Sequence, residues 1–241
     1  MPPLLEVACF NAQSAIEAAS SGANRIELCA SYPLGGTTPL LSTFISVRHT
    51  LQSINKRSLL SPLEPPLSIH VMIRPRGGNF IYSEMEFETM LEDVQRFYHA
   101  GASGFVFGIL TTAHLVDILR CRKLIASAGG RPCVFHRAFD IIANPEMEAQ
   151  MNVLIECGFT ALLTSGNAKD ALEGRDILSR LINASQGEID IIIGGGLRSA
   201  NVEMLLHMGA EWIHTSAITN DNSEMADVEE VKLIKAILHN H

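Results

Sequence analysis

The sequence lacks the features that mark several classes of protein. No apolar run approaches the roughly 18 to 20 residues that a membrane-spanning helix needs. No cluster of lysine and arginine interrupts a balance of 26 acidic to 18 basic residues, and the formal net charge is −8. Nucleic acid and anionic membranes are therefore not expected as partners. The opening residues, MPPLLEVACF, include no basic segment, so we expect no signal peptide.

Cysteine is sparse, with five residues spread over a chain of 241 and no CxxC pair. A chain of this length can build a core without disulfides, and an odd number of cysteines cannot pair completely. We therefore expect reduced thiols and a cytoplasmic location. Cys121, Cys133 and Cys157 lie in segments with apolar neighbours, so we expect them in the core.

Short apolar runs rich in β-forming residues alternate with amphipathic segments along the whole chain. Hydrophobic residues make up 47% of the sequence, enough for a sizeable core. Eight such units average about 30 residues each, the size of a strand–helix repeat. The predicted strands are Leu4–Cys9, Asn24–Cys29, Leu67–Arg74, Ser103–Phe107, Pro132–His136, Thr160–Leu163, Ile189–Ile193 and Glu211–His214. The predicted helices include Asn11–Ser21, Glu84–His99, Pro145–Glu156, Lys169–Ala184, Ala200–His207 and Asp227–Leu238.

This alternation predicts an α/β fold, a single (β/α)8 TIM-type barrel that forms one domain over residues 1–241. A doubly wound open sheet is the alternative, because counting strands does not prove closure. The glycine triplet Gly194–Gly196 lies near the end of the chain and not after the first strand, which argues against a Rossmann domain and a nucleotide cofactor. The proline-rich stretch Asn55–Pro66 is predicted to be a surface loop.

Polar residues gather where the predicted strands end, which is where TIM barrels carry their chemistry. Carboxylates inside apolar strands are costly unless they are paired, so Glu6 and Glu27 need cationic or hydrogen-bonding partners. The candidates for that role are Arg74, His136, Arg137 and His214. A buried ion-pair network that only closes the barrel would explain the same residues. We favour a polar pocket for a small oxygen-rich ligand, because six strands deliver such groups to one end.

Two parts of this set are suited to anions. Arg74 and Arg76, followed by two glycines, could hold a carboxylate or phosphate through their guanidinium groups. The amides of Gly195 and Gly196 precede a predicted helix and could bind phosphate, although a tight turn would need the same glycines. Further residues assigned to substrate binding are Arg137, Ser165 and His214.

The same strand ends offer groups for acid–base chemistry. His136 could act as a general base or polarise a carbonyl group, with Glu6, Glu27 and Asp140 as further catalytic candidates. No predicted strand contains lysine, which argues against a Schiff-base aldolase. These residues suit a lyase or isomerase that acts on a small sugar-like or phosphorylated anionic metabolite.

Metal binding is a separate hypothesis. Cys9 and Cys29 end adjacent predicted strands, and two thiolates at the barrel mouth would favour Cu(I). Both thiols could equally be small buried apolar groups. A harder cation could instead be held by Glu6, Glu27, His136 and His214.

The chain resembles the CutC family from Leu4 to about Ser216, on a set of motifs in the family's order. They are EVACF (6–10), ANRIELCA (23–30), GGTTP (35–39), VMIRPRGGNFIYS (71–83), GFVFGIL (104–110), FHRAFD (135–140), LLTSGNAKDALEG (162–174) and IIGGGL (192–197). The resemblance implies a TIM-barrel-like fold, a cytoplasmic location and a homodimer or homotetramer. It also implies copper homeostasis, with Cu(I) bound at the positions of Cys9 and Cys29.

Three hypotheses follow. The first, which the resemblance favours, is a cytosolic copper homeostasis protein that binds Cu(I) through Cys9 and Cys29. The second, which the polar pocket favours, is a barrel enzyme in which Arg74 and Arg76 hold an anion while His136 and a glutamate move protons. The third is a barrel whose pocket no longer has a function.

Overall fold

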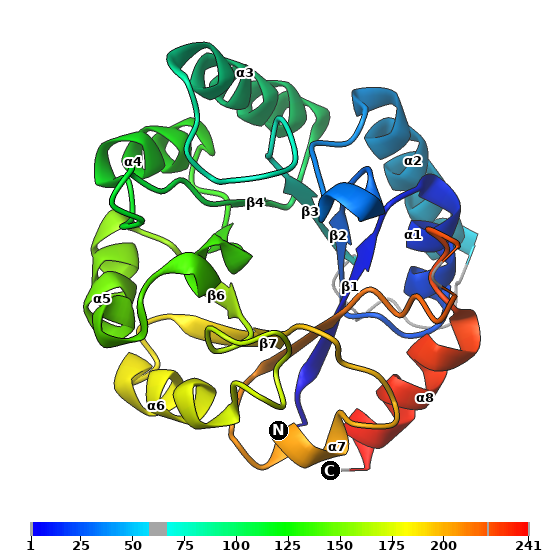
Figure 1. Ribbon diagram of the computed structural model, residues 1–241. Helices are drawn as coiled ribbons and strands as arrows, with labels where there is room; N and C mark the ends of the chain where they lie inside the picture. The colour runs from blue at the N-terminus through cyan, green and yellow to red at the C-terminus, as the bar shows by residue number, and fades with distance from the viewer. Residues whose placement is uncertain (1, 58–66, 221, 241) are drawn as a thin grey trace.

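A computed structural model describes residues 2–57, 67–220 and 222–240, and its centre is a closed barrel of eight parallel strands (Figure 1). The strands are β1 (Leu4–Cys9), β2 (Arg25–Leu28), β3 (Ser68–Met72), β4 (Gly104–Phe107), β5 (Cys133–Phe135), β6 (Ala161–Thr164), β7 (Asp190–Gly194) and β8 (Trp212–Thr215). The helices around them are α1 (Ala12–Ser20), α2 (Leu41–Arg57), α3 (Glu84–Ala100), α4 (Ile118–Ser127), α5 (Met147–Cys157), α6 (Arg175–Ser185), α7 (Glu203–Leu206) and α8 (Val228–His239).

The pairing of β1 closes the barrel and excludes the open sheet. β1 is parallel to β2 on one side and to β8 on the other. In this register Glu6 lies beside Arg25 of β2 and beside His214 of β8. Residues in register on parallel strands project to the same face of a sheet. The three side chains therefore meet inside the barrel.

The eight predicted strands are confirmed, with ends that shift by at most two residues. The helices deviate more. α2 and α4 were not among the predicted helices, and α6 begins at Arg175, six residues later than expected. The carboxylate of Asp170 accepts hydrogen bonds from the amides of Leu172 and Glu173, and this turn replaces the first part of the predicted helix. Asn55–Arg57 of the predicted loop belongs to α2, and residues 58–66 lie outside the described part.

The interior of the barrel is divided into two chemically different halves. One half is apolar and contains Val106, Val134, Ala161, Leu163 and Ile192 from β4–β7. The other half is charged or ionisable and contains Glu6, Arg25, Glu27, His70 and His214 from β1, β2, β3 and β8. A separate apolar layer lies between the strands and the helices. Polar chemistry is thus concentrated on one side of the barrel axis.

Candidate active site at the carboxyl ends of the strands

A cavity of about 110 Å³ opens among the carboxyl ends of the strands. It combines acidic, basic, sulfur and aromatic side chains in one small space. Its lining residues are Ala8, Phe10, Glu27, Cys29, Gly35, Met72, Arg74, Phe80, His136, Arg137, Leu163 and His214.

Glu6 lies beneath this cavity and is held in its ionised form. Its Oε2 atom accepts a hydrogen bond from Nε of Arg25, and its Oε1 atom lies 2.7 Å from Nδ1 of His214. Burial of Glu6 opposes ionisation, but the charge of Arg25 and the hydrogen bond with His214 outweigh it and lower the pKa to about 2. The ionised carboxylate of Glu6 accepts a hydrogen bond from the Nδ1–H group of His214. This bond fixes the orientation of the His214 ring.

Glu27 lines the cavity and differs from Glu6 in its surroundings. Its Oε2 atom lies 3.6 Å from Nε2 of His214, and its buried Oε1 atom has no hydrogen-bond partner in the described residues. Burial raises the pKa of Glu27 to about 7, against the attraction of His214. Burial also disfavours the charged form of His214, but its hydrogen bond with Glu6 and the charge of Glu27 raise its pKa overall. Glu27 and His214 therefore both hold a proton more readily than they would in water.

His136 faces the cavity as a neutral ring. Its Nδ1 atom accepts a hydrogen bond from the amide of Ala138 at 3.3 Å, which leaves the proton on Nε2. Burial lowers the pKa of His136 to about 3, and the charge of Arg74 adds to this effect. Nε2 is buried and has no partner in the described part of the chain. His136 thus offers a hydrogen-bond donor to a bound molecule and does not carry charge.

The two arginines that were predicted to clamp an anion are occupied by the protein. Arg74 donates to three carbonyl oxygens, of Leu34, Gly36 and Gly78, at 2.7–2.9 Å, so it ties two loops together. It does line the cavity, where its buried Nε has no partner in the residues described. Arg76 is not among the lining residues, and all its nitrogens donate within its own loop and to Glu86.

The partners predicted for the two glutamates are only partly right. His214 does pair with both carboxylates, whereas Arg74 is bound to backbone carbonyls and His136 to the amide of Ala138. Arg137 pairs with Asp140 through Nε at 2.8 Å. The cation beside Glu6 is Arg25, which period-two alternation places on the same face as Glu27. The ring of Trp212 covers its guanidinium, 3.7 Å from Cζ to the ring centroid.

Asp140 and Ser165 form a hydrogen-bonded anchor beside the cavity and do not line it. Asp140 accepts hydrogen bonds from Thr164, Asn167 and Ser165, while Ser165 Oγ also accepts one from Nη2 of Arg137. These contacts hold the Arg137 guanidinium at the cavity.

Gly195 and Gly196 form the loop that faces Arg137, and both have positive φ, 115° and 69°. A side chain is disfavoured there, so the turn itself requires glycine. A Cβ atom on Gly195 would lie 3.4 Å from Cζ of Arg137. The loop backbone therefore lies close to a guanidinium that is 40% exposed. An anionic group could reach both the loop and this guanidinium.

Cys9 and Cys29 do not enter the cavity together. Cys29 lines it, with Met72 nearby in the same interior cluster. Cys9 belongs to the layer between strands and helices, with Leu5 and Val7. Burial raises the pKa of both thiols, and the charge of Glu27 raises them further. All five cysteines are free and buried, including the three that were expected in the core.

A group of possible metal ligands is formed by Glu6, Glu27 and His214, whose ligand atoms lie within 4.8 Å of one another. His136, the fourth residue proposed for a hard cation, is not part of this group. The charge of Glu6 is already balanced by Arg25. Glu27 has no such partner, since it faces only His214 at 3.6 Å and its other oxygen is unpaired in the described residues.

Six lining residues were not predicted as parts of the site: Ala8, Phe10, Gly35, Met72, Phe80 and Leu163. Met72 is the last residue of β3 and lies two residues before Arg74. Strand alternation could therefore have placed the Met72 and Arg74 side chains on the same face. Phe80 follows in a loop, where no periodicity indicates direction.

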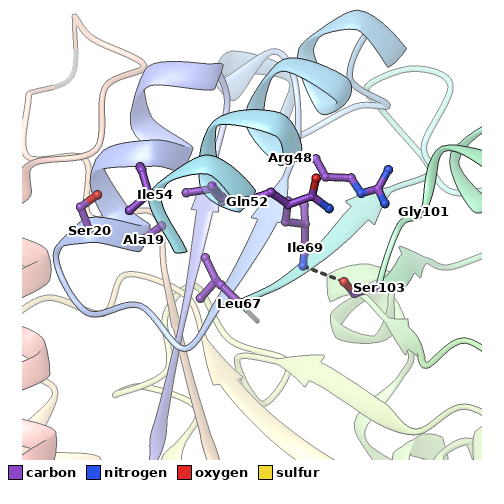
Figure 2. A pocket seen from close by; sticks show the side chains of 10 residues that line it. Ala19, Ser20, Arg48, Gln52, Ile54, Leu67, Ile69, Gly101 and Ser103 are labelled. Atoms are coloured by element: carbon purple, nitrogen blue, oxygen red, sulfur yellow. Dashed lines mark hydrogen bonds between the residues drawn. The ribbon is translucent and has the colours of Figure 1, made fainter. Parts of the chain in front are cut away.

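A second pocket, of about 270 Å³, lies at the opposite end of the barrel, between α1, α2 and the amino ends of β3 and β4 (Figure 2). There Arg48 donates to the carbonyl of Ala100 at 2.7 Å, and Ser103 Oγ accepts a hydrogen bond from the amide of Ile69. Its lining offers no carboxylate, histidine or thiol in the described residues, so the candidate active site is the cavity at the carboxyl ends.

In the described part of the chain, no helix combines the length and apolarity needed to cross a membrane.

Comparison with known proteins places this barrel in a family. A Citrobacter koseri protein named as family protein CutC is 40% identical over 215 residues, which is 89% of this chain and 79% of the relative. A Caenorhabditis elegans protein named copper homeostasis protein cutC homolog is 35% identical over 251 residues, covering 97% of this chain and 94% of its own. A solved structure of a Streptococcus agalactiae protein, also named for CutC and copper homeostasis, superposes with a TM-score of 0.81 at 29% identity. The superposition covers 90% of this chain and 99% of the Streptococcus agalactiae chain. Residues 3–219 match the family itself, and the chain belongs to the CutC family.

Proposed function

We propose that this protein is an enzyme that moves protons on a small oxygenated metabolite, as an isomerase or a lyase. The observation that carries the proposal is the buried carboxylate of Glu27, which lines the cavity. One of its oxygens has no partner in the described residues and the other faces His214. A buried polar atom without a partner is costly, and a ligand at the cavity would supply one.

Glu27 is suited to act as the general acid and base. Its pKa of about 7 means that both protonation states are populated near neutral pH, which is the condition for efficient proton transfer. His214 can take up or return the proton, because Glu6 on its far side stays ionised beside Arg25. The three groups form a relay that begins at the cavity and ends at a fixed charge.

His136 supplies the complementary role. Its Nε2–H group, in a neutral ring, can donate a hydrogen bond to a carbonyl or hydroxyl oxygen on which negative charge develops. Removal of a proton from the carbon beside a carbonyl group by Glu27 would then form an enolate oxygen that His136 stabilises. On an α-hydroxy carbonyl compound, reprotonation at the former carbonyl carbon, with the hydroxyl proton moved to the former carbonyl oxygen, gives isomerisation. Loss of a leaving group, with its electron pair, from the carbon β to the carbonyl gives a lyase reaction.

Arg137 is the group that best fits an anionic part of the substrate. It lines the cavity beside the Gly195–Gly196 loop, and its guanidinium is oriented by Asp140 and Ser165. Arg137 therefore takes the anion-binding role that was predicted for Arg74 and Arg76, because most donors of those two arginines are hydrogen-bonded to other protein groups. A sugar-like or phosphorylated acid fits these groups.

Deuterium exchange tests the proposal without knowledge of the full reaction. Small oxo acids, hydroxy acids and sugar phosphates are incubated with the protein in D2O, and proton NMR reports the loss of carbon-bound hydrogen. We expect exchange with at least one compound that binds, and we expect Glu27→Gln to abolish it. Cys9→Ser, whose thiol lies outside the barrel interior, is the matched control and should retain it. Exchange that survives Glu27→Gln would rule out the assigned role.

Copper binding is the second candidate function, favoured by the sulfur atoms of Cys29 and Met72 at the same cavity. Thiolate and thioether ligands select Cu(I). Two relatives carry copper homeostasis in their names. In this chain Cu(I) would be cargo held by one thiol in the cavity, since Cys9 faces the outer layer.

Location and assembly remain part of the proposal. Five free cysteines are compatible with a reducing compartment, and we propose the cytoplasm. The homodimer or homotetramer that the family resemblance implies is a prediction that light scattering can check.

A further inference from the structure

A second hollow lies beside the candidate active site on the same end of the barrel. It measures about 270 Å³ and is formed by the loops that follow β3, β4 and β5. Its walls are mainly the side chains of Phe80, Ile81, Leu110 and Ile141. Ile141 is 48% exposed, although it is a large apolar residue. Phe80 and Ile81 are half-buried and Leu110 is buried, so the hollow presents one exposed apolar side chain on an apolar wall.

Phe80 is the wall that the hollow shares with the cavity. On the cavity side its ring centroid lies 4.9 Å from that of His136, and it lies 4.8 Å from Cζ of Arg74. The backbone around Phe80 is fixed, since its carbonyl accepts the amide of Leu110 at 2.9 Å and Arg74 holds the carbonyl of Gly78. One aromatic side chain on a fixed loop thus borders both the polar cavity and the apolar hollow.

We propose that the hollow behind Phe80 is the second half of the substrate site and binds an apolar group of the substrate. The substrate is then amphipathic: a polar end reacts between Glu27 and His136, and a short alkyl or aromatic group lies against Ile81, Leu110 and Ile141. This inference rests on the function proposed above and specifies its substrate class.

The sizes of the two spaces agree with this division. A cavity of about 110 Å³ holds only a few water-sized groups, at about 30 Å³ each. Small-molecule sites usually measure about 300–1,000 Å³ and combine apolar walls with a few polar groups. Neither space reaches that range alone, but the two together do. The cavity provides the polar groups and the hollow provides the apolar wall.

Three probes test the inference on the full chain with carbon-13-labelled isoleucine methyl groups. Lactate carries the polar end alone, benzyl alcohol approximates the apolar end, and 3-phenyllactate joins both. NMR titration gives their affinities, and the methyl signals of Ile81 and Ile141 report the hollow. We expect 3-phenyllactate to bind at least about tenfold more tightly than lactate and to shift both methyl signals.

Ile141→Asn tests the site of that gain, and Ile45→Asn on α2, where the isoleucine is 40% exposed, is the matched control. We expect Ile141→Asn to remove the advantage of 3-phenyllactate and to leave lactate binding unchanged, whereas Ile45→Asn changes neither. Equal affinities of lactate and 3-phenyllactate, an advantage that survives Ile141→Asn, or no binding of any probe would overturn the inference.

The same titrations separate this inference from the proposed function. If benzyl alcohol shifts Ile81 but 3-phenyllactate binds no more tightly than benzyl alcohol, the hollow is an independent site and the inference fails. If 3-phenyllactate shows the expected gain while no bound compound exchanges deuterium, the two-part site stands and the proton-transfer function fails.

Discussion

Cys9 ends β1 and Cys29 directly follows the neighbouring strand β2, and their side chains project to opposite faces of the barrel wall. The backbones are close, since the amide of Cys29 donates to the carbonyl of Cys9 at 2.8 Å. Cys9 nevertheless packs with Leu5 and Val7 under the helices, whereas Cys29 packs inside the barrel with Met72. A side chain's direction along a strand alternates, so strand-end neighbours need not share a face.

The first prediction concerns Cu(I) binding. Cys29→Ser should weaken Cu(I) binding at least about tenfold, because it removes the only cysteine thiol among the described residues that line the cavity. Cys9→Ser should leave the affinity within about twofold, since its thiol is in the outer layer. Anaerobic competition with a Cu(I) chelator measures both variants. Equal loss of affinity in the two variants would show that both thiols hold the metal.

The second prediction concerns the buried pair of Glu6 and Arg25, whose side chains are 1% and 8% exposed. Glu6→Gln leaves the guanidinium buried without its countercharge, and a broken buried pair typically costs about 3–5 kcal/mol. We expect a loss of that size in the free energy of unfolding, measured by urea denaturation at neutral pH.

The control for this prediction is the exposed pair of Glu92 and Arg96 on α3, with side chains 65% and 58% exposed. Exposed pairs contribute about 0–1 kcal/mol, so Glu92→Gln should change the free energy of unfolding by less than about 1 kcal/mol. Similar losses in both variants would contradict the assignment of Glu6 to a dry ion pair.

The third prediction is a dependence of stability on pH. Glu27 has a pKa of about 7 in the folded protein against an ordinary value of 4.5, so folding favours its protonated form. As pH rises through this window the unfolded chain loses its proton first, and stability falls. His214, with a raised pKa, acts in the same direction. Glu27→Gln cannot ionise, so its stability should fall less steeply with pH between these two values.

Urea denaturation at several pH values across the same window measures the two slopes. Glu92→Gln, which changes an exposed carboxylate, should keep the slope of the unmodified protein. A Glu27→Gln variant with an unchanged slope would mean that this carboxyl titrates at its ordinary pKa in the folded protein.

The alternation of short apolar runs with amphipathic segments is enough to predict the barrel, because parallel strands covered by helices are largely apolar. The period of two along a strand relates the interior residues Arg25 and Glu27 of β2 to Cys29, which directly follows it. The same period identifies Arg25 as a partner for a carboxylate on that face. It also places Cys9 and Glu6, which are three residues apart, on opposite faces of β1. Position at a strand end alone indicates neither the role of Arg25 nor the opposite directions of Cys9 and Glu6.

The roles of the arginines depend on loops whose paths the sequence pattern does not define. Arg74 lies two residues after β3 ends at Met72, and not at the strand end that was predicted, and its acceptors are carbonyl groups of two different loops. Arg76 is drawn away by Glu86, which also forms the capping box of α3 with Ser83. A guanidinium donates hydrogen bonds to backbone carbonyls as well as to anions, so residue type alone could not distinguish an anion-binding arginine from one that anchors loops.

The last prediction concerns the space occupied by the His136 ring. A Cβ atom on Gly108 would lie 2.6 Å from Nδ1 of His136. The ring has little room to retreat, because it contacts Phe80 and Phe135 and its Nδ1 is hydrogen-bonded to Ala138. Gly108→Ala should therefore cost about 1–3 kcal/mol of stability by overpacking and should displace the ring.

Because a displaced Nε2–H can no longer donate to a bound oxygen, Gly108→Ala should slow deuterium exchange about a hundredfold or more. Long-range nitrogen-15 NMR of the histidine rings would record the altered position and proton. Gly130→Ala is the control, since its new methyl group meets nothing within 4 Å and only its positive φ of 80° is strained. It should lose some stability and keep both the His136 signals and the exchange rate. If Gly108→Ala keeps them as well, His136 does not act at the position that the structure gives it.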